Sequence, residues 1–400
     1  MKRIQRLLGA GGPTGETREL SRREFVSATA VGVLGLASPF VQGRTTERRA
    51  YIGTYTTDGR SEGIYQVRFN PGTGALRVLD GAAKSANPSY LALHANGRVL
   101  YAANETQEFN GQPSGGVSAF RIDRASGRLT LINQQASQGK APCYVSLDRT
   151  NRYLLVANYV GGTIATLPIR RDGGLGMARS VIEHEGSGPN TTRQTSPHPH
   201  CILPDRRNRH MLVVDLGTDS VLAYRLDATN GKLTVVTPGT ALAPGAGPRH
   251  LVFHPALPFA YVANELDSTV TAFRYDGERG AFDEVQTTPA SPGGTVPNNF
   301  PADIHVAPSG RFLYLSNRGE NSIAAFAIDT ATGQLAPIHQ IACGGNWPRN
   351  FSFDPTGRFL LVANQRSDSI VVFRADADTG RLTATDHRAE LPVPVCIRFV

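Results

Sequence analysis

Short apolar or alternating runs, separated by turn residues, recur along the chain from Ala50 onward. The clearest unit, Trp347–Thr383, contains four of them. The first run follows a proline, the second ends in Ala-Asn, the third alternates apolar and polar residues, and a Thr-Gly turn leads to the fourth. Runs of this length, rich in β-branched and aromatic residues and bounded by turns, predict β-strands. The pattern therefore predicts a unit of four antiparallel strands.

This unit returns at intervals of roughly 50 residues, which is the period of propeller blades. First strands are expected to follow Pro88, Pro142, Pro199, Pro248, Pro301, Pro348 and Pro394. Second strands are expected to end at Thr54, Asn104, Asn158, Asp215, Asn264, Asn317 and Asn364. Seven units in the same register predict seven blades and disfavour an open sandwich.

The two ends of the repeating region each supply part of one unit. Ala50–Tyr55 has the pattern of a second strand, and Val395–Val400 has the pattern of a first strand. Paired together, they would complete a blade and leave no free sheet edge at the junction. Residues 44–400 are therefore predicted to form an all-β, seven-bladed β-propeller whose closing blade is shared between N- and C-terminal strands.

Residues 1–43 have a different character. The pair Arg22-Arg23 stands directly before an apolar stretch, Phe25–Val41, which is rich in Ala and Gly and short for a membrane span. This arrangement resembles a twin-arginine export signal more than a buried helix. We therefore expect the twin-arginine export machinery as a partner, a periplasmic or secreted location, and no stable membrane span in the mature chain.

Charge and cysteine content narrow the classes of function. The net charge is +8, and residues 1–43 carry six basic and three acidic residues, so the remainder carries +5 (8 − 3). No basic cluster is interleaved with aromatic residues, and we expect no nucleic-acid partner. The cysteines fit no zinc-binding spacing and are expected to be unpaired buried thiols, with a disulfide as the alternative. They are Cys143, Cys201, Cys343 and Cys396.

One end of the predicted propeller carries the unusual residues. Antiparallel strands place the start of each first strand and the end of each second strand at the same end, where the three longest loops also lie. These loops are Glu105–Gly116, the stretch around Ser187–Pro199, and Thr287–Pro301. Ionisable residues from four neighbouring repeats converge there, which predicts a binding or catalytic site. They are His200, Arg249, Glu265, Arg318 and Arg349.

The two histidines of the segment Pro197–His200 have different expected roles. His200 occupies the register position of Arg249 and Arg349, so it is the candidate general base, with a structural histidine as the alternative. His198 lies in the preceding loop, where it would touch substrate or cap the rim. A metal held by this pair is disfavoured because the neighbouring arginines would repel a cation. We expect no cofactor and no metal.

Several motifs resemble a known family. They are YIGTYT, PHPH followed by DLGTDSV, GPRHLVFHP, VANEL, LSNRGENSI and NWPRNFSFDPTGRFLLVANQ. Over nearly all of residues 50–400 the chain resembles the lactonase family of seven-bladed propellers, which includes propeller-type 6-phosphogluconolactonases and fungal carboxymuconate cycloisomerases. The cycloisomerase branch uses one histidine, two arginines and one glutamate, and the resemblance assigns these roles to His200, Arg249, Arg318 and Glu265.

The resemblance implies a hydrolase that opens a sugar-type or anionic lactone. His200 would act as the base and Glu265 as the acid or as the group that orients His200, with the arginines binding anion and oxyanion. Arg349 and Asn350 lie in a further family motif, and together with His198 and His250 they form the expected substrate-binding set. The export signal distinguishes this chain from family members that act on a cytoplasmic sugar phosphate.

Three alternatives stay open at this point. The same site could run a lactonising cycloisomerisation, or the rim could bind a sugar or a protein without catalysis. A calcium-dependent lactonase would use oxygen ligands at the strand ends. Those ligands would be Asn104, Asn158, Asp215 and Asp303. Because such residues end the second strand in all but one repeat, a turn-closing role is favoured for them.

Overall fold

A computed structural model describes residues 47–236, 239–294 and 296–400. The chain divides into two compact units, Met1–Arg44 and Thr45–Val400. The expected export signal, residues 1–43, lies outside the described residues, so it stays a prediction.

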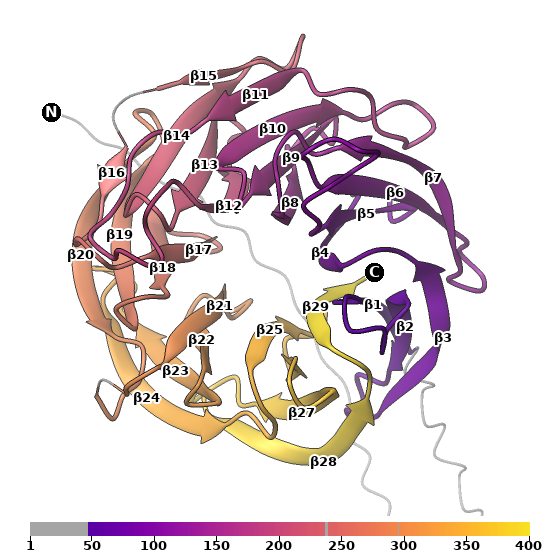
Figure 1. Cartoon of the computed structure of the whole chain (residues 1–400). Coiled ribbons are helices and arrows are strands. Elements are labelled where there is room, and N and C mark those ends of the chain that lie inside the picture. The colour runs from indigo at the N-terminus through magenta and orange to yellow at the C-terminus, as the bar shows by residue number, and fades with distance from the viewer. Residues whose placement is uncertain (1–46, 237–238, 295) are drawn as a thin grey trace, which may run out of the picture. The chain divides into compact units, whose positions relative to one another are not determined.

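The strands of the second unit form seven sheets that follow one another around a ring (Figure 1). Blade 1 contains β4 (Pro88–Leu93), β5 (Val99–Asn104), β6 (Gly116–Ile122) and β7 (Leu129–Ala136). Blade 2 contains β8 (Pro142–Leu147), β9 (Tyr153–Asn158), β10 (Thr163–Pro168) and β11 (Ser180–Glu183). Blade 3 contains β12 (Pro199–Pro204), β13 (His210–Asp215), β14 (Ser220–Leu226) and β15 (Leu233–Val235), with β16 (Thr240–Ala241) paired to β14.

The remaining blades repeat the order. Blade 4 contains β17 (Pro248–Phe253), β18 (Phe259–Asn264), β19 (Thr269–Asp276) and β20 (Ala281–Pro289). Blade 5 contains β21 (Phe300–Val306), β22 (Phe312–Arg318), β23 (Ser322–Ile328) and β24 (Leu335–Ala342). Blade 6 contains β25 (Pro348–Phe353), β26 (Phe359–Asn364), β27 (Ser369–Ala375) and β28 (Leu382–Glu390). Blade 7 contains β29 (Pro394–Phe399), β1 (Arg48–Thr54), β2 (Gly63–Phe69) and β3 (Leu76–Lys84).

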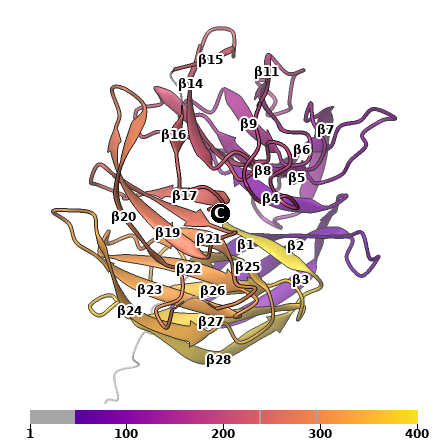
Figure 2. The same cartoon turned by 60° about the vertical axis from the view of Figure 1, so that its left-hand side comes forward.

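The seventh blade confirms the predicted closure of the ring. Strand β29 pairs antiparallel with β1, with Ala50 opposite Phe399 and Ile52 opposite Ile397. The last strand of the chain therefore lies beside the first, although the two stand at opposite ends of the colour scale (Figure 2). The all-β, seven-bladed fold is confirmed, and the expected strand ends are correct to within one residue, since β22 continues one residue beyond Asn317 to Arg318.

The core lies between neighbouring blades, where the second strands are completely buried. Every residue of β5, β9, β13, β18 and β26 is buried, because both faces of these strands pack against an adjacent sheet. The outermost strands, such as β7, are largely exposed. This difference explains why second strands appear in the sequence as continuous apolar runs, whereas the fourth strands are polar.

A repeated contact also joins some blades to the next. Tyr101 of β5 donates a hydrogen bond to the carbonyl oxygen of Gly173 in blade 2, at 3.0 Å, and Tyr314 of β22 makes the same bond to Gly380 in blade 6, at 2.8 Å. Both glycines have positive φ and press directly against the first residue of the neighbouring second strand, so a side chain would not fit there.

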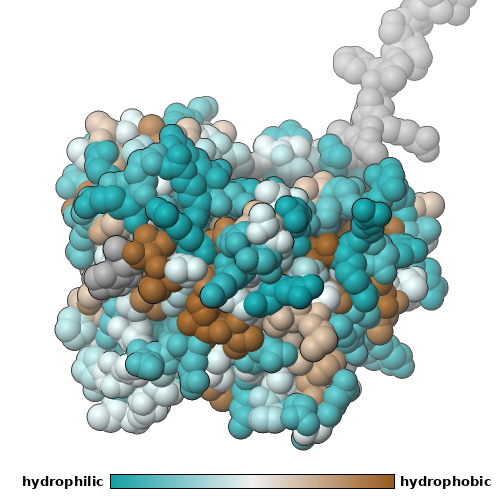
Figure 3. Space-filling view, turned by 90° about the horizontal axis from the view of Figure 1, so that it is seen from above, coloured by the Kyte–Doolittle hydropathy of each residue, from teal (hydrophilic) through white to brown (hydrophobic). Residues whose placement is uncertain are grey.

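Surface and cysteines complete the description. Figure 3 shows one side of the molecule, on which hydrophobic residues form small patches interrupted by hydrophilic ones. In the described part of the chain no helix is long and apolar enough to cross a membrane. All four cysteines are buried free thiols, as expected.

Candidate active site

A repeated backbone irregularity places the candidate residues on one rim. In β12, β17 and β25 the strand register shifts directly after the opening proline, at His200, Arg249 and Arg349. A bulge of this kind leaves one residue outside the ladder and redirects its side chain. Glu265 follows the end of β18, and Arg318 ends β22, so both lie at the same end of their blades.

These residues meet around a cavity of about 170 Å³. Its lining includes His200, Glu265, Arg318 and Arg349, which the sequence predicted to converge. It also includes residues that the sequence analysis did not select. These are Tyr55, Glu105, Cys143, Tyr159 and Arg193. A smaller adjoining cavity shares Cys143 and Arg349 and is lined by Arg249, His250 and Asn350.

Glu265 is the centre of an arginine cluster. Its Oε2 atom lies 2.6 Å from Nη2 of Arg318 and 3.2 Å from Nε of Arg249, and its Oε1 atom lies 2.6 Å from Nη2 of Arg193. Burial alone would raise the pKa of this carboxyl, but the guanidinium groups of Arg318, Arg249 and Arg193 outweigh burial and hold it far below its ordinary value. Glu265 is therefore a carboxylate at neutral pH.

This ionisation does not favour one of the roles expected for Glu265, that of general acid. A general acid must carry a proton at the working pH, and this carboxyl does not hold one. Nor does it orient His200, since no hydrogen bond joins the two side chains among the described residues. The geometry instead makes Glu265 the shared counter-ion that keeps three guanidinium groups together.

His200 is held as a neutral imidazole. It is 5% exposed, and burial lowers its pKa well below the ordinary value, with Arg249, His250 and Arg349 adding to the shift. Its Nδ1 atom lies 3.7 Å from Sγ of Cys143, whose thiol also contacts the carbonyl oxygens of Pro199 and His200. In the tautomer with the proton on Nδ1, the thiol donates to a carbonyl oxygen and its sulfur accepts from Nδ1–H. Nε2 has no hydrogen-bond partner in the described part of the chain.

His250 and Asn350 form hydrogen bonds with Arg249 and Asp303 next to the larger cavity. Arg249 donates from Nη1 to Nε2 of His250 at 3.1 Å, and His250 donates from Nδ1 to Oδ1 of Asp303 at 2.9 Å. Burial and, next, the charge of Arg249 lower the pKa of His250 to about 3, against the opposing effect of Asp303. Asn350 donates to the second oxygen of Asp303 and accepts from the amide of Ile397.

The direct substrate contacts expected of His250, Asn350 and His198 are therefore not favoured. The two ring nitrogens of His250 and the amide of Asn350 already have protein partners. His198 stacks on Tyr159 with ring centroids 4.5 Å apart and contacts its carbonyl oxygen through Nδ1 at 2.8 Å. It does not line the cavity, so its position corresponds to the alternative role of capping the rim.

Arg349 is held by two residues from other blades. Its guanidinium lies 5.3 Å from the ring centroid of Tyr55, and Nη2 lies 3.8 Å from Oε2 of Glu105. Tyr55 donates to the same Glu105 oxygen at 2.8 Å. Tyr55 and Glu105 each follow a second strand directly, so their register position was the available sequence signal.

Arg193 has no equivalent position in the other repeats, because it belongs to the long loop between β11 and β12. It donates to Glu265 and, at 3.1 Å, to the hydroxyl of Tyr159, and its side chain is 37% exposed. The length of this loop on the predicted rim was the only indication that it contributes to the site.

The charges around the two cavities favour an anion. The arginines number four and the glutamates two, with the Asp303 carboxylate behind His250. These arginines are Arg193, Arg249, Arg318 and Arg349. Since both histidines are neutral, the cluster is net positive. Fixed guanidinium groups in such a site bind carboxylates or phosphates and stabilise a developing oxyanion.

The residues considered as calcium ligands have other partners. Asn104 donates to Ser85 and to the carbonyl of Ala86, and Asp215 accepts from His198 and Gly217. These contacts correspond to the turn-closing role. Within the described ranges there is no group of three or more His, Cys, Asp or Glu side chains that could hold a metal ion.

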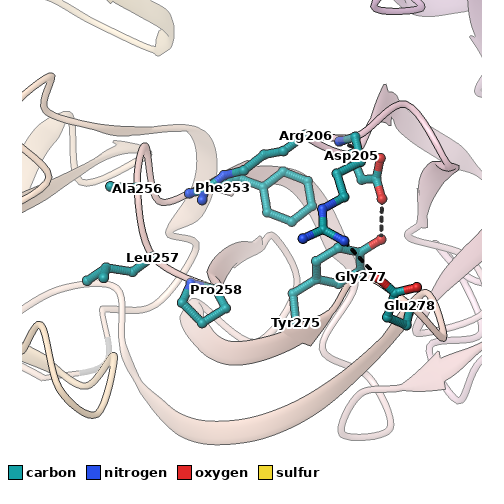
Figure 4. A pocket seen from close by; sticks show the side chains of 10 residues that line it. Asp205, Arg206, Phe253, Ala256, Leu257, Pro258, Tyr275, Gly277 and Glu278 are labelled. Atoms are coloured by element: carbon teal, nitrogen blue, oxygen red, sulfur yellow. Dashed lines mark hydrogen bonds and ion pairs between the residues drawn. The ribbon is translucent and has the colours of Figure 1, made fainter.

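A larger pocket of about 280 Å³ lies on the opposite rim, between blades 3 and 4 (Figure 4). Most of its ionisable groups are paired within the pocket. Arg207 contacts Glu278 at 2.7 Å, and Tyr275 donates to Asp205 at 3.0 Å. None of the predicted site residues lines it, so the chemistry is concentrated at the smaller cavity.

Known proteins share this fold and sequence. The family model described as lactonase, 7-bladed beta-propeller, matches residues 49–399. A 6-phosphogluconolactonase of Bacillus subtilis is 40% identical over 355 residues, covering 89% of this chain and 99% of the relative. The crystal structure of a Pseudomonas aeruginosa periplasmic gluconolactonase superposes with a TM-score of 0.83 at 36% identity, covering 89% of this chain and 99% of that one. The chain belongs to the lactonase family of seven-bladed β-propellers.

Proposed function

We propose that the protein is a hydrolase of sugar-type lactones. The observation that carries this proposal is the cavity itself, which is lined by neutral His200 together with Arg318 and Arg349. Lactone opening needs a base for water and a cation for the tetrahedral oxyanion, and both are present.

In this mechanism Nε2 of His200 removes a proton from water, and the water oxygen attacks the lactone carbonyl. The resulting oxyanion is stabilised by the guanidinium groups of Arg318 and Arg349. When the ring C–O bond breaks, the imidazolium returns the proton to the leaving alkoxide, so His200 serves as base and then as acid. The product carboxylate forms beside the arginine cluster.

Glu265 acts through the arginines rather than on the substrate. Its two oxygens hold Arg193, Arg249 and Arg318 in fixed positions. The hydrogen-bonded pair Asp303–His250 also holds Arg249 in a fixed position. Preorganised cations need no rearrangement as the oxyanion forms, which is the main source of electrostatic catalysis.

Two relatives support the substrate class. The Bacillus subtilis protein is named a 6-phosphogluconolactonase, and the Pseudomonas aeruginosa structure a periplasmic gluconolactonase. Together with the twin-arginine pattern at Arg22-Arg23, the second name supports an exported enzyme acting outside the cytoplasm. The net positive rim accommodates the neutral lactone, its acidic product or a phosphorylated lactone.

The decisive experiment measures hydrolysis of D-glucono-1,5-lactone and its 6-phosphate by residues 44–400, against the spontaneous rate. We expect turnover of at least one lactone, and a loss of roughly 10²–10⁴-fold in kcat for His200→Asn. His387→Asn, on the outer strand β28, is the matched control and should retain full activity.

Two outcomes would overturn the proposal. Hydrolysis no faster than the spontaneous reaction for either lactone, with ligand affinity unchanged in His200→Asn, would show a binding propeller. Conversion of an unsaturated dicarboxylate in place of the lactones would show a lactonising cycloisomerase.

A further inference from the structure

A second concentration of positive charge lies at the other end of the blades. In blade 1 the pair Pro88–Asn104 marks the active-site rim, and Leu93–Leu100 marks the opposite one. A groove of about 510 Å³ opens on that opposite rim, between blades 1 and 2. Its charged lining consists of Arg98, Arg121, Arg124, Arg170, Arg171 and Asp172.

Most of these arginines have no protein partner. Arg170 lies 3.6 Å from Asp172. The other four side chains make no hydrogen bond, ion pair or ring contact with any residue that the structure describes. Elsewhere on the same rim some arginines are paired, for example Arg207 with Glu278 and Arg279 with Asp276. The five arginines of the groove are exposed, and with one carboxylate among them they give it a net positive charge that attracts anions.

Other blades contain an aromatic ring covered by an arginine at the position that corresponds to Val99 in the groove. The first residue of the second strand is a large ring in blades 4 and 6, and an arginine of the third strand lies over it. The guanidinium of Arg274 is 5.0 Å from the ring centroid of Phe259, and that of Arg374 is 4.7 Å from Phe359. In blade 5 the arginine comes from the preceding turn, with Arg311 at 5.3 Å from Phe312.

Blade 1 has the arginines without the ring. Val99 pairs with Arg121 in the same register as Phe259 pairs with Arg274. Arg98 precedes Val99 as Arg311 precedes Phe312. The substitution of valine for the aromatic residue removes the flat surface that these guanidinium groups cover in other blades.

The floor of the groove is nevertheless fixed. Gly173 presses against Val99 as Gly380 presses against Phe312, and Tyr101 bonds to the carbonyl of Gly173. Asn133 of β7 holds the same turn through both the amide and the carbonyl of Leu175. The turn at Gly173 thus packs on Val99 as the equivalent turns pack on phenylalanine in other blades, and Val99 and Gly173 both line the groove.

We propose that this groove binds a small ligand that combines a flat aromatic ring with phosphate or other acidic groups. The ring would take the place over Val99 that a phenylalanine fills in blades 4, 5 and 6. Arginine stacks on ring faces and binds phosphate oxygens in pairs, so the same side chains serve both parts of the ligand. The volume lies within the range of pockets for small molecules.

The test measures calorimetric binding of three probes: ATP, which has a ring and phosphates, tripolyphosphate, which has phosphates alone, and adenosine, which has the ring alone. We expect ATP to bind at least tenfold more tightly than tripolyphosphate, and adenosine to show no measurable binding. ATP affinity should fall as salt is raised.

Two variants locate the binding site. Val99→Phe restores the ring of the other blades and fills the groove, so it should weaken ATP at least tenfold without changing lactone hydrolysis. Arg171→Gln should also weaken ATP binding and does not alter the packed floor. Arg225→Gln is the control, because Arg225 pairs with His210 in blade 3 as Arg121 pairs with Val99, and it should bind ATP as the wild type does.

Several results would overturn the proposal. ATP affinity unchanged in both Val99→Phe and Arg171→Gln would exclude the groove, as would no ATP binding by the wild type. Loss of ATP binding in Arg318→Gln alone would assign the anion to the active-site rim. Equal affinity for tripolyphosphate and ATP would remove the ring from the ligand. None of these results depends on whether lactones are hydrolysed.

Discussion

His200 and Glu265 face one cavity, and the surrounding arginines act on both in the same direction. Positive charge disfavours a proton on His200 and favours the carboxylate of Glu265. The site thus holds a neutral base and a permanent anion at the same pH. This combination suits a reaction in which the imidazole of His200 both removes the proton from water and returns it to the leaving group.

The pH dependence of His200 follows from the direction of its pKa shift. Since the pKa is lowered, the imidazole stays unprotonated below the ordinary value of about 6.5. We expect kcat/KM for lactone hydrolysis to be flat from pH 8 to below pH 6.5 and to decline only at more acidic pH. Initial rates corrected for spontaneous hydrolysis measure this profile, and an acid limb at or above pH 6.5 would contradict it.

Replacement of Glu265 by glutamine separates its two expected roles. Without the carboxylate, the buried guanidinium groups of Arg249 and Arg318 and the partly exposed one of Arg193 lose their counter-ion. Breaking a buried ion pair costs about 3–5 kcal/mol. We expect a lower unfolding temperature, a loss of activity, and partial recovery of the unfolding temperature when gluconate is added. A variant of normal stability that lost only the basic limb of the pH profile would instead show a general acid.

The sequence identified His200, Arg249, Glu265, Arg318 and Arg349 because their register positions are equivalent between repeats. It did not reveal that both ring nitrogens of His250 and Nδ1 of His198 have protein partners. Side-chain direction depends on bulges and on partners from other blades, such as Asp303 for His250. Periodicity alone carries no information on those partners.

At the scale of elements, the bulge after the opening proline takes one residue of a buried strand out of the ladder at the rim where the candidate site lies. The register shift recurs in β4, β8, β12, β17 and β25, where the residue at the shift is serine, cysteine, histidine, arginine and arginine in turn. The loops between blades then add groups that no strand supplies. The loop between β11 and β12 contributes Arg193, which spacing between repeats could not indicate.

Arg193 is expected to affect substrate binding more than the chemical step. It is partly exposed and approaches Glu265 from a loop, whereas Arg318 is buried on a strand. We expect Arg193→Met to raise KM about tenfold and to change kcat by less than threefold, as loss of uniform binding predicts. Steady-state kinetics measure both values. A fall in kcat with KM unchanged would place Arg193 at the reacting atoms.

At the scale of the whole molecule, the ring separates two positively charged regions by the length of the blades. The repeat pattern predicted the seven blades and their closure, because each blade must bury both faces and so repeats its apolar positions. The groove beside Val99 was not predicted, because it results from a single departure from the repeat pattern, the valine in place of an aromatic residue. Its shape also depends on contacts between blades 1 and 2, which the repeat pattern does not specify.

The stability of the fold should decrease in acid earlier than carboxylates alone would require. The pKa of buried His250 is lowered from 6.5 to about 3, so between these values the unfolded chain binds a proton that the folded chain does not. Stability attributable to this residue is therefore complete above pH 6.5 and is lost as pH falls. Melting temperatures at pH 7 and pH 5 should differ less in His250→Gln than in the wild type, and an equal or larger difference would contradict this account.

The pairing of β1 with β29 has a consequence for biosynthesis. Strand β1 pairs with β2 on one side, but its partner on the other side, β29, is made only after the six other blades. A chain that lacks β29 would present one unpaired edge of β1, which invites association with other chains. Synthesis of β29, rather than the folding of any one blade, therefore closes the ring.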